Sequence, residues 1–363
     1  MTAPRPPAAP TAGPLTPDDA ELLLRAAAAA PSVHNTQPWL LALDDGGGGT
    51  SGTSGTSGID LYADPSRRLR HADPDGRSML VSIGAAVLDV RVALAYLGLG
   101  AQTSIDPGLG SSLAGHLARG SDAPFLVARV RATPVPPGSR PAALTRLFPA
   151  VWTRRTNRRP FRAEPVPADL LDVLSAAAAA EGARLRAVVD PSSVAAVVGV
   201  LRAAEAAETA DPALLGERAA HVGGPGRTSG IPVGSLGPRP AAAADGSSPA
   251  AVRDLGVGVA AVRESAAFET APTLALLGTP ADEPADWVRA GQALQRLWLE
   301  VTTAGLHASL LNQPLEHARL RPALLALAPG AGAAPQVLLR IGHGEPVPPT
   351  PRRPLSELLL RTG

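Results

Sequence analysis

An apolar run of leucines and alanines near the start of the chain, preceded by polar residues, predicts a helix over residues 16–30. Residues that favour the first turn of a helix stand together at its beginning: Thr16, Pro17, Asp18 and Asp19. Leucines and a run of alanines continue the pattern until Pro31, which cannot extend it. The stretch PSVHNTQPW at residues 31–39 is therefore expected to be a loop directly after a helix.

Further along the chain, short apolar runs bounded by turn residues predict strands, and longer apolar or alanine-rich runs predict helices. The expected strands are residues 38–43, 59–63, 125–133, 183–189, 272–279 and 336–344. The expected helices are residues 77–98, 165–182, 193–220 and 285–304, with a short one in the C-terminal tail. Helices and strands are thus expected to mix along the whole chain.

Three stretches lack a pattern that builds a packed element. Residues 1–15 are rich in proline and alanine, and we expect a disordered tail. Residues 46–58 repeat glycine, serine and threonine between two expected strands, which predicts a flexible hairpin tip. Residues 222–250 are rich in glycine, proline, serine and alanine, and we expect a long loop or a lid.

One helical pattern occurs twice. Residues 84–101, GAAVLDVRVALAYLGLGA, align without gaps with residues 291–308, GQALQRLWLEVTTAGLHA. The glycines at both ends of the pattern match, and each copy is followed by an expected strand. In a chain this rich in alanine and glycine, identical residues alone are weak evidence of a repeat. The shared order of helix and strand nevertheless indicates two related halves. We expect these halves at residues 16–140 and 141–363.

Composition narrows the classes of function. Hydrophobic residues make up 45% of the chain and charged residues 18%, as in a folded globular protein. The net charge of +1 argues against a dedicated nucleic-acid-binding protein, which carries a strongly basic face. All 33 basic side chains are arginine and there is no cysteine. This excludes a P-loop lysine, Schiff-base catalysis, disulfides and thiolate chemistry.

The ends and apolar runs of the chain bear on its location. The N-terminus has no apolar segment typical of a signal peptide, and no stretch of 18 apolar residues is free of charges or breakers. The lack of cysteine fits a reducing compartment. We therefore expect a cytoplasmic protein with no membrane partner.

The stretch at residues 31–39 concentrates polar side chains in an alanine-rich region. It holds Asn35, one of only three asparagines in the chain. Its hydroxyl, amide and backbone N–H groups suit hydrogen bonding to the edge of a planar heterocycle. His34 could act as an acid, a base or a ligand, but a lone histidine is more often structural, and no nucleophile with its base stands beside it. A binding loop is the better interpretation.

A second polar motif, RRTNRRPF at residues 154–161, holds four arginines within six positions. Planar guanidinium groups suit a phosphate, and arginines this close repel one another unless an anion lies among them. The alternative is a solvent-exposed basic turn. Another pair, Arg352 and Arg353, follows the last expected strand. The two sets could converge on one phosphate.

Common catalytic and metal-binding motifs are missing. The chain has no GxSxG, no HExxH and no GxGxxG after a strand. QPLEH at residues 313–317 lacks the first histidine of the HxxEH pattern, and GPGRTSG at residues 224–230 does not follow a strand. The seven histidines are scattered, so we expect no metal site.

Five segments, taken in order, resemble the Acg-type branch of the nitroreductase-like flavoproteins. They are APSVHNTQPW, HADPDGRSMLVSIGAAV, RRTNRRPF, WVRAGQALQRLWLEVTTAGL with NQPLE, and RIGHGEPVPPTPRRPL. Together they span most of residues 17–360. The resemblance implies an α+β sandwich of nitroreductase type, in which two related halves are fused in one chain as a pseudo-dimer. Such a chain could be monomeric.

The resemblance also implies one FMN site per chain, shared by both halves. The first half would place six residues along the isoalloxazine ring: Pro31, Ser32, Val33, His34, Asn35 and Gln37. The second half would hold the phosphate. Aligning the family pattern R-x-S-x-R-x-F on Phe161 gives the register that we prefer, because it uses the aromatic residue: Arg155, Asn157 and Arg159. Aligning it on Thr156 selects Arg154 and Arg158 instead, and the sequence does not distinguish Arg352 from Arg353.

The function implied by the resemblance is an FMN-dependent oxidoreductase. Electrons would pass from NADH or NADPH through the flavin to a nitro compound, a quinone or a similar small-molecule acceptor, with no catalytic side chain required. An alternative is a protein that binds or sequesters FMN beneath a lid with little turnover, and residues 222–250 are the candidate lid. A regulatory protein with a vestigial site is disfavoured because both motifs keep their polar residues.

Overall fold

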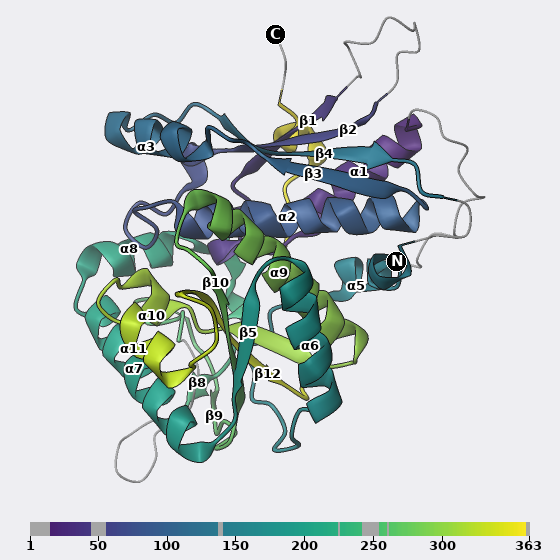
Figure 1. Ribbon diagram of the computed structural model, residues 1–363. Helices are drawn as coiled ribbons and strands as arrows, with labels where there is room; N and C mark the ends of the chain where they lie inside the picture. Colours follow the sequence, from purple (N-terminus) through teal and green to yellow (C-terminus); the bar gives the residue numbers. More distant parts are fainter. Residues whose placement is uncertain are drawn as a thin grey trace, which may run out of the picture.

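The computed structural model describes residues 15–44, 56–136, 141–223, 226–241, 254–259 and 261–360 (Figure 1). Parts of three predicted stretches lie outside the described residues: 1–14 of the tail, 46–55 of the hairpin tip, and 224–225 with 242–250 of the lid. The margins of two of them belong to the fold. Leu15 and Thr56 form an antiparallel bridge, and Gly58 is the first residue of a strand. Both predicted stretches were therefore drawn too long.

The first sheet is antiparallel, with its strands in the order β1-β2-β4-β3. Its strands are β1 (Trp39–Asp44), β2 (Gly58–Ala63), β3 (Gly100–Ile105) and β4 (Phe125–Thr133). Helices α1 (Pro17–Ala29) and α2 (Arg77–Tyr96) lie against it (Figure 1). A capping box between Thr16 and Asp19 starts α1, as the sequence pattern predicted.

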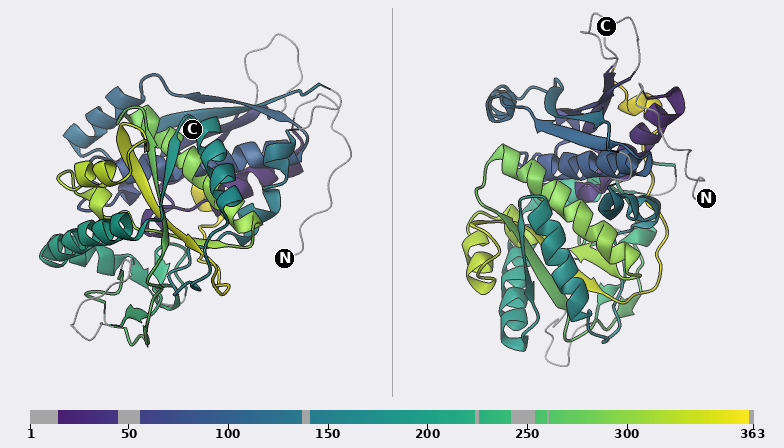
Figure 2. Two further views of the ribbon diagram at one scale, coloured as in Figure 1. Left: turned by 60° about the horizontal axis from the view of Figure 1, so that its bottom comes forward. Right: turned by 45° about the vertical axis from the view of Figure 1, so that its right-hand side comes forward.

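The second sheet is also antiparallel, with its strands in the order β11-β12-β10-β5. Its strands are β5 (Arg184–Val188), β10 (Thr273–Thr279), β11 (His307–Leu310) and β12 (Ala334–Gly342). Helices α6 (Ala168–Ala180) and α9 (Pro284–Thr303) lie on one side of it, and α7 (Pro191–Thr209) on the other (Figures 1 and 2). Because both faces are covered, all nine residues of β12 are buried.

The two sheets share one arrangement. In each, a helix precedes the first strand and a 20-residue helix, α2 or α9, follows the second strand. In each, the order across the sheet is first, second, fourth and third strand. The repeated pattern in the sequence lies on the two long helices and leads into β3 and β11.

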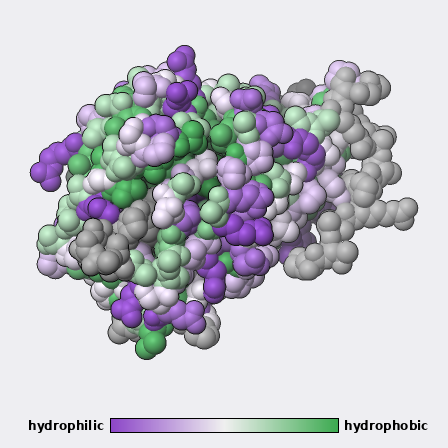
Figure 3. All heavy atoms as spheres, turned by 90° about the horizontal axis from the view of Figure 1, so that it is seen from below, coloured by the Kyte–Doolittle hydropathy of each residue, from purple (hydrophilic) through white to green (hydrophobic). Residues whose placement is uncertain are grey.

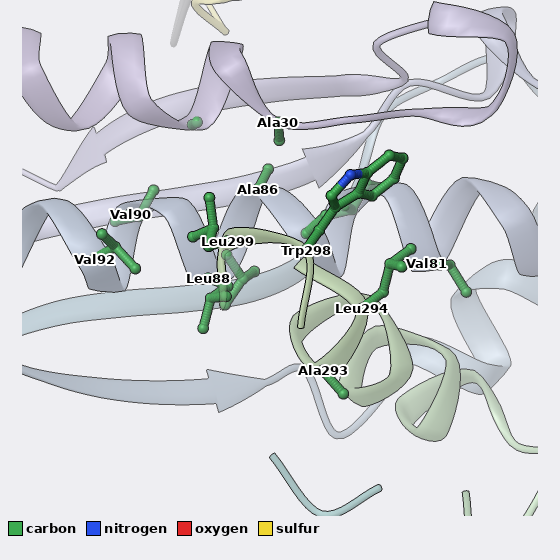
Figure 4. Close-up of a cluster of buried hydrophobic side chains, with 14 of the residues drawn as sticks. Ala30, Val81, Ala86, Leu88, Val90, Val92, Ala293, Leu294, Trp298 and Leu299 are labelled. Atoms are coloured by element: carbon green, nitrogen blue, oxygen red, sulfur yellow. The ribbon is translucent and has the colours of Figure 1, made fainter. Parts of the chain in front are cut away.

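Helices α2 and α9 touch at the two glycines that the repeat aligns. A Cβ atom on Gly84 would lie 2.1 Å from the carbonyl oxygen of Val288, and one on Gly291 would lie 2.0 Å from that of Val81. Only glycine permits this approach. Figure 4 shows buried side chains of the core cluster around the crossing, among them Val81 and Ala86 of α2 and Leu294 and Trp298 of α9.

Helix α2 is long and apolar enough to cross a bilayer, although no membrane-spanning segment was expected from the sequence. Of its most apolar 18-residue window, 89% is buried inside the protein. Contacts with α1, α9 and the first sheet cover it. Its apolar character is thus accounted for by core packing.

The remaining elements are short. The helices are α3 (Leu109–Arg119), α4 (Ala142–Thr145), α5 (Phe148–Thr153), α8 (Pro212–Ala220), α10 (Gln313–Glu316), α11 (Arg321–Leu327) and α12 (Leu355–Leu358), with 3-10 turns η1 (Val33–Asn35), η2 (Pro65–Arg67) and η3 (Val233–Ser235). Two parallel strand pairs join β6 (Val222–Gly223) to β7 (Ile231–Pro232) and β8 (Arg239–Pro240) to β9 (Ser265–Ala266). The described part of the predicted lid is therefore partly folded. Seen from below, hydrophobic and hydrophilic residues are interspersed on the molecular surface (Figure 3).

The predicted mixture of helices and strands is confirmed, with boundaries shifted by a few residues. The expected helix over residues 193–220 is wrong in one respect, because it is two helices, α7 and α8. Asp211 breaks it, since its side chain accepts hydrogen bonds from the N–H groups of Ala213 and Leu214 and so starts a new helix. The sequence reading missed β3, α3, β11 and α11.

Candidate functional site

A cavity lies where α2 and α9 approach the loop after α1. Counting its open mouth and the solvent in it, the cavity encloses about 800 Å³. Its walls combine the predicted loop with side chains of both long helices, of the 156–158 segment and of the second sheet. They include Pro31, Ser32, Val33, His34, Val81, Ser82, Thr156, Arg158, Leu255, Trp298, Asn312 and Gln336.

The loop after α1 has a strained backbone. His34, Asn35 and Gln37 have φ angles of 45°, 53° and 50°, in the left-handed region that residues with a Cβ atom avoid. Among the described residues, no other non-glycine residue has a positive φ. Strain of this kind persists only where the surroundings impose it, and it gathers at ligand sites.

Hydroxyl groups hold the cavity side of the loop. The Oγ atom of Ser32 accepts from the N–H of Gln37 at 2.9 Å, which closes the turn. The N–H of Val33 donates to the Oγ atom of Ser82 on α2 at 3.1 Å. Ser32 and Val33 therefore face the cavity from fixed positions. The His34 ring also lines the cavity, and its centroid lies 6.2 Å from that of His221, which follows α8.

Asn35 and Gln37 point away from the cavity and join three segments of the chain. Their amide groups donate to the carbonyl oxygens of Gly230 and Thr228, both at 2.9 Å. On their other side, the Oε1 atom of Gln37 accepts from the N–H of Arg353 at 2.8 Å. Of the six loop residues predicted to line the ring, four line the cavity, and these two hold the loop against the lid region and the C-terminal segment.

Asn35→Ala is expected to lower the free energy of unfolding by roughly 2–4 kcal/mol. It removes two amide hydrogen bonds from buried partners and leaves an alanine at a left-handed φ. Asn35→Gly loses the same bonds without the backbone strain, so it should cost about 1 kcal/mol less. Urea denaturation measures both variants. An alanine variant as stable as the wild type would contradict this role.

The arginine-rich segment after α5 divides between two cavities. Thr156 and Arg158 line the main cavity, and also a smaller one of about 330 Å³, where Arg155 and the exposed Arg159 join them. Asn157 lines neither: it is fully buried, donates to the carbonyl oxygen of Glu345 at 2.8 Å and accepts from the N–H of Arg159. Of the register anchored on Phe161, Arg155 and Arg159 line the smaller cavity; of the register anchored on Thr156, Arg158 lines both cavities and Arg154 neither.

Three arginines from two distant segments form a cluster, in which Arg155 lines the smaller cavity and Arg154 and Arg352 line neither of the two. Arg154 is buried, with its guanidinium 4.8 Å from the Trp298 ring centroid. The charges of Arg155 and Arg352 repel that of Arg154, and Arg155 also repels Arg352. Burial and the neighbouring Arg352 lower the pKa of Arg154 to about 9. Burial and Arg155 lower the pKa of Arg352 to about 10. The Nε atoms of Arg154 and Arg352 are buried without a hydrogen-bond partner in the described part of the chain.

Arg353 differs from Arg352 in its partners. Its guanidinium donates to the carbonyl oxygens of Gln37, Trp39 and Glu357. These contacts fix the C-terminal segment on β1 and leave Arg353 no role facing a cavity. Arg352 donates to Asn35 and Thr350 through Nη1, while its Nε remains available.

Several residues of the site were not predicted. Trp298, Ser82, Asn312, Gln336 and Arg77 line the cavity, yet the sequence reading gave them no role. All but Gln336 lie in segments that carried the family resemblance, so a signal was present but unassigned. Asp89, fully buried in α2 and coupled to Arg154 and Arg352, was also missed. No group of three or more acidic residues and histidines that could hold a metal ion occurs among the described residues.

Comparison with known proteins gives a consistent result. No protein-family model matches the chain. It is 31% identical to Rv3131 of Mycobacterium tuberculosis, provisionally named an NAD(P)H nitroreductase, over 93% of this chain and 90% of that protein. It is 30% identical to Acg of the same organism, which carries the same provisional name, over 95% and 96%. A solved nitroreductase with bound FMN from Bacteroides fragilis is 15% identical, with a TM-score of 0.34 over 55% of this chain and 88% of that one.

Proposed function

Since the chain belongs to the nitroreductase-like proteins, in the branch of Acg and Rv3131, we propose that it is an FMN-dependent oxidoreductase. Electrons from NADH or NADPH would pass through FMN to a nitro compound, a quinone or a similar small-molecule acceptor. When bound, the flavin supplies the redox chemistry. The side chains of this protein bind, orient and cover it.

The observation that carries the proposal is the charge of the arginine cluster. Arg154, Arg155 and Arg352 bring three positive charges together, and Asp89 supplies at most one negative charge. A phosphate monoester carries nearly two negative charges at neutral pH and three strong acceptor oxygens. The buried, unpartnered Nε atoms of Arg154 and Arg352 are donors of the kind that such a group needs.

The main cavity suits the ring of the same cofactor. Pro31, Ser32, Val33 and His34 form one wall, and the apolar faces of Val81 and Leu294 with Trp298 form another. Hydroxyl and backbone groups at one edge with apolar walls are what a flat heterocycle requires. We propose Pro31 to His34 for the ring, and Arg154, Arg155, Thr156, Arg158 and Arg352 for the phosphate. Asn35, Gln37, Asn157 and Arg353 would position these segments, and Arg159 stays a candidate at the smaller cavity.

We also propose that the chain is two nitroreductase-like halves, residues 16–140 and 141–363, fused as a pseudo-dimer. The equal strand order of the two sheets supports this, as does the glycine-to-glycine contact of α2 with α9. The fused arrangement would need no second chain to complete its site, and we propose a cytoplasmic location from the lack of cysteine. Light scattering across the chromatographic peak of the protein is expected to give the mass of one chain.

One feature favours the alternative of flavin sequestration. Residues 226–241 are hydrogen-bonded directly to the loop at residues 31–37. The N–H of Gly230 donates to the carbonyl oxygen of Asn35 at 3.1 Å, and the side-chain amides of Asn35 and Gln37 donate to Gly230 and Thr228. Leu255 adds an apolar side chain to the cavity wall. A cover fixed this firmly would restrict the access of an electron donor or acceptor.

An anaerobic titration of the FMN-loaded protein, followed by visible absorption, distinguishes an oxidoreductase from a flavin-sequestering protein. An enzyme is expected to lose its flavin band on addition of NADH or NADPH, and to recover it with a quinone or a nitro compound. A band that responds to dithionite but to neither nicotinamide cofactor would support sequestration. A chain that takes up no FMN would contradict both.

A further inference from the structure

Asp89 occupies an unusual position, in the middle of the long apolar helix α2. Its side chain is fully buried. Gln295 of α9 donates to its Oδ1 atom at 2.7 Å, and its Oδ2 atom has no hydrogen-bond partner among the described residues. Core packing does not call for a carboxyl group here, and an incompletely paired one is costly to bury.

The charged groups that act on Asp89 come from two other segments. Arg154 follows α5 and Arg352 lies in the C-terminal segment, and both attract the ionised carboxylate. Neither lies within 4.0 Å of it in the described structure, so the attraction is through space rather than an ion pair. In the part of the chain that the structure describes, the one other polar group acting on it is the neutral amide of Gln295 from α9. Both arginines also keep a buried Nε donor without a hydrogen-bond partner among the described residues, and both are proposed above for the phosphate.

We propose that Asp89 is the internal counter-charge of the phosphate-binding arginines and takes up a proton when a phosphate group binds. The inference rests on the proposed function. Without a ligand, the carboxylate offsets part of the charge of Arg154 and Arg352. A bound phosphate neutralises the same arginines and adds negative charge nearby, so the ionised form of Asp89 loses its stabilisation. Asp89 is thus a positioning residue that couples cofactor binding to pH.

The direction of the coupling follows from Asp89 itself. Burial raises its pKa to about 7, against the lowering effects of Gln295, Arg154 and Arg352. The ligand-free protein therefore holds Asp89 mostly ionised at pH 8 and mostly protonated at pH 6. A phosphate raises the pKa further, so binding at pH 8 must take up a proton, and binding at pH 6 does not. By linkage, affinity for the phosphate falls as pH rises above about 7, by at most about tenfold per pH unit.

The test compares FMN with riboflavin, which lacks the phosphate, by titration calorimetry between pH 6.5 and 8.0. Each titration is run in two buffers of different ionisation enthalpy, so that proton uptake is read directly. The phosphate of FMN has its second pKa near 6 and is a dianion over most of this range. At pH 8, FMN is expected to bind with uptake of about one proton, and riboflavin with none.

Two variants test whether Asp89 is the group that takes up the proton. Asp89→Asn keeps the shape of the side chain and is expected to bind FMN without proton uptake and with an affinity independent of pH. Glu181→Gln is the matched control, because Glu181 is also a buried carboxylate held by arginines, Arg91 and Arg296, but away from both cavities. It should keep the wild-type pH dependence even if it is less stable.

The wild-type measurement decides the matter even if Asp89→Asn fails to fold. FMN binding at pH 8 without proton uptake would overturn the role of Asp89 and leave the proposed function standing. So would an Asp89→Asn variant that keeps the wild-type uptake. Equal uptake with riboflavin would place the proton away from the phosphate and also overturn it. A wild-type chain that binds no FMN at any pH would remove the proposed function, and this inference with it.

Discussion

The double variant Arg154→Met/Arg155→Met is expected to bind FMN about 10²–10⁴ times more weakly than the wild type, with riboflavin affinity changed by less than about threefold. Each arginine would supply a charge-assisted hydrogen bond to the phosphate, worth roughly 1.5–3 kcal/mol. Methionine keeps much of the stem volume of arginine, which limits the loss of packing at the buried Arg154. Fluorescence titration of both flavins measures the effect.

Arg162→Ala is the control for general electrostatics. Arg162 lies close to the same segment but is exposed and lines neither cavity. Its replacement should leave FMN affinity within about twofold, since exposed charges contribute little. A folded double variant with wild-type FMN affinity, or one that loses riboflavin equally, would contradict phosphate binding by Arg154 and Arg155.

The register of the arginine-rich segment has its own discriminating variant. If Phe161 anchors the family pattern, Arg159→Met should weaken FMN binding as strongly as a change at Arg155. If Thr156 anchors it, Arg158→Met should do so instead and Arg159→Met should have a small effect. The exposure of Arg159 and the position of Arg158 between the two cavities lead us to expect the second result.

Gly291→Ala is expected to destabilise the protein by more than about 4 kcal/mol, or to prevent folding. The added Cβ atom would lie 2.0 Å from the carbonyl oxygen of Val81 and 2.8 Å from the Cα atom of Gly84, both on the backbone of α2. A backbone cannot rotate away as a flexible side chain can. The two long helices would have to separate at the centre of the main core cluster.

Gly199→Ala is the matched control for this variant. Gly199 lies inside helix α7, and a Cβ atom there would meet nothing within 4 Å. Alanine at this position should raise the free energy of unfolding by roughly 0.5–1 kcal/mol, because it restricts the unfolded chain and favours the helix. Urea denaturation of both variants gives the comparison. A Gly291→Ala protein with an unchanged midpoint would show that α2 and α9 do not pack this closely.

The sequence predicted those parts of the fold whose causes are local. Thr16 and Asp19 cap α1, alternation of apolar residues marked β4, and a continuous apolar run marked β10. The repeat predicted that two helices correspond, but not that Gly84 and Gly291 lie against each other, because contact between distant segments depends on tertiary packing. Strands β3 and β11 were missed because they are short and mostly polar or small in sequence, GAQTSI and HASL, so no apolar run marks them.

The candidate site shows the same limit. Both polar motifs were found, since rare polar residues stand out in an alanine-rich chain. The sequence did not predict which residues of each motif line a cavity and which hold neighbouring segments. That depends on backbone φ angles and on partners far away in the chain. Arg352 and Arg353 are adjacent in sequence and both donate to backbone carbonyls, yet among the described residues only Arg352 keeps a buried Nε without a partner, whereas the Nε of Arg353 donates to Glu357. Asp89 escaped notice because a single carboxyl in an apolar helix forms no motif.

Native mass spectrometry of the chain titrated with FMN tests the central claim most directly. A single composite site predicts one chain carrying one FMN, with no second flavin bound at excess ligand and no requirement for a second chain. Binding of two flavins to one chain, binding only to a dimer, or no binding at all would contradict a site built from the loop at residues 31–34 and the arginines at residues 154, 155 and 352.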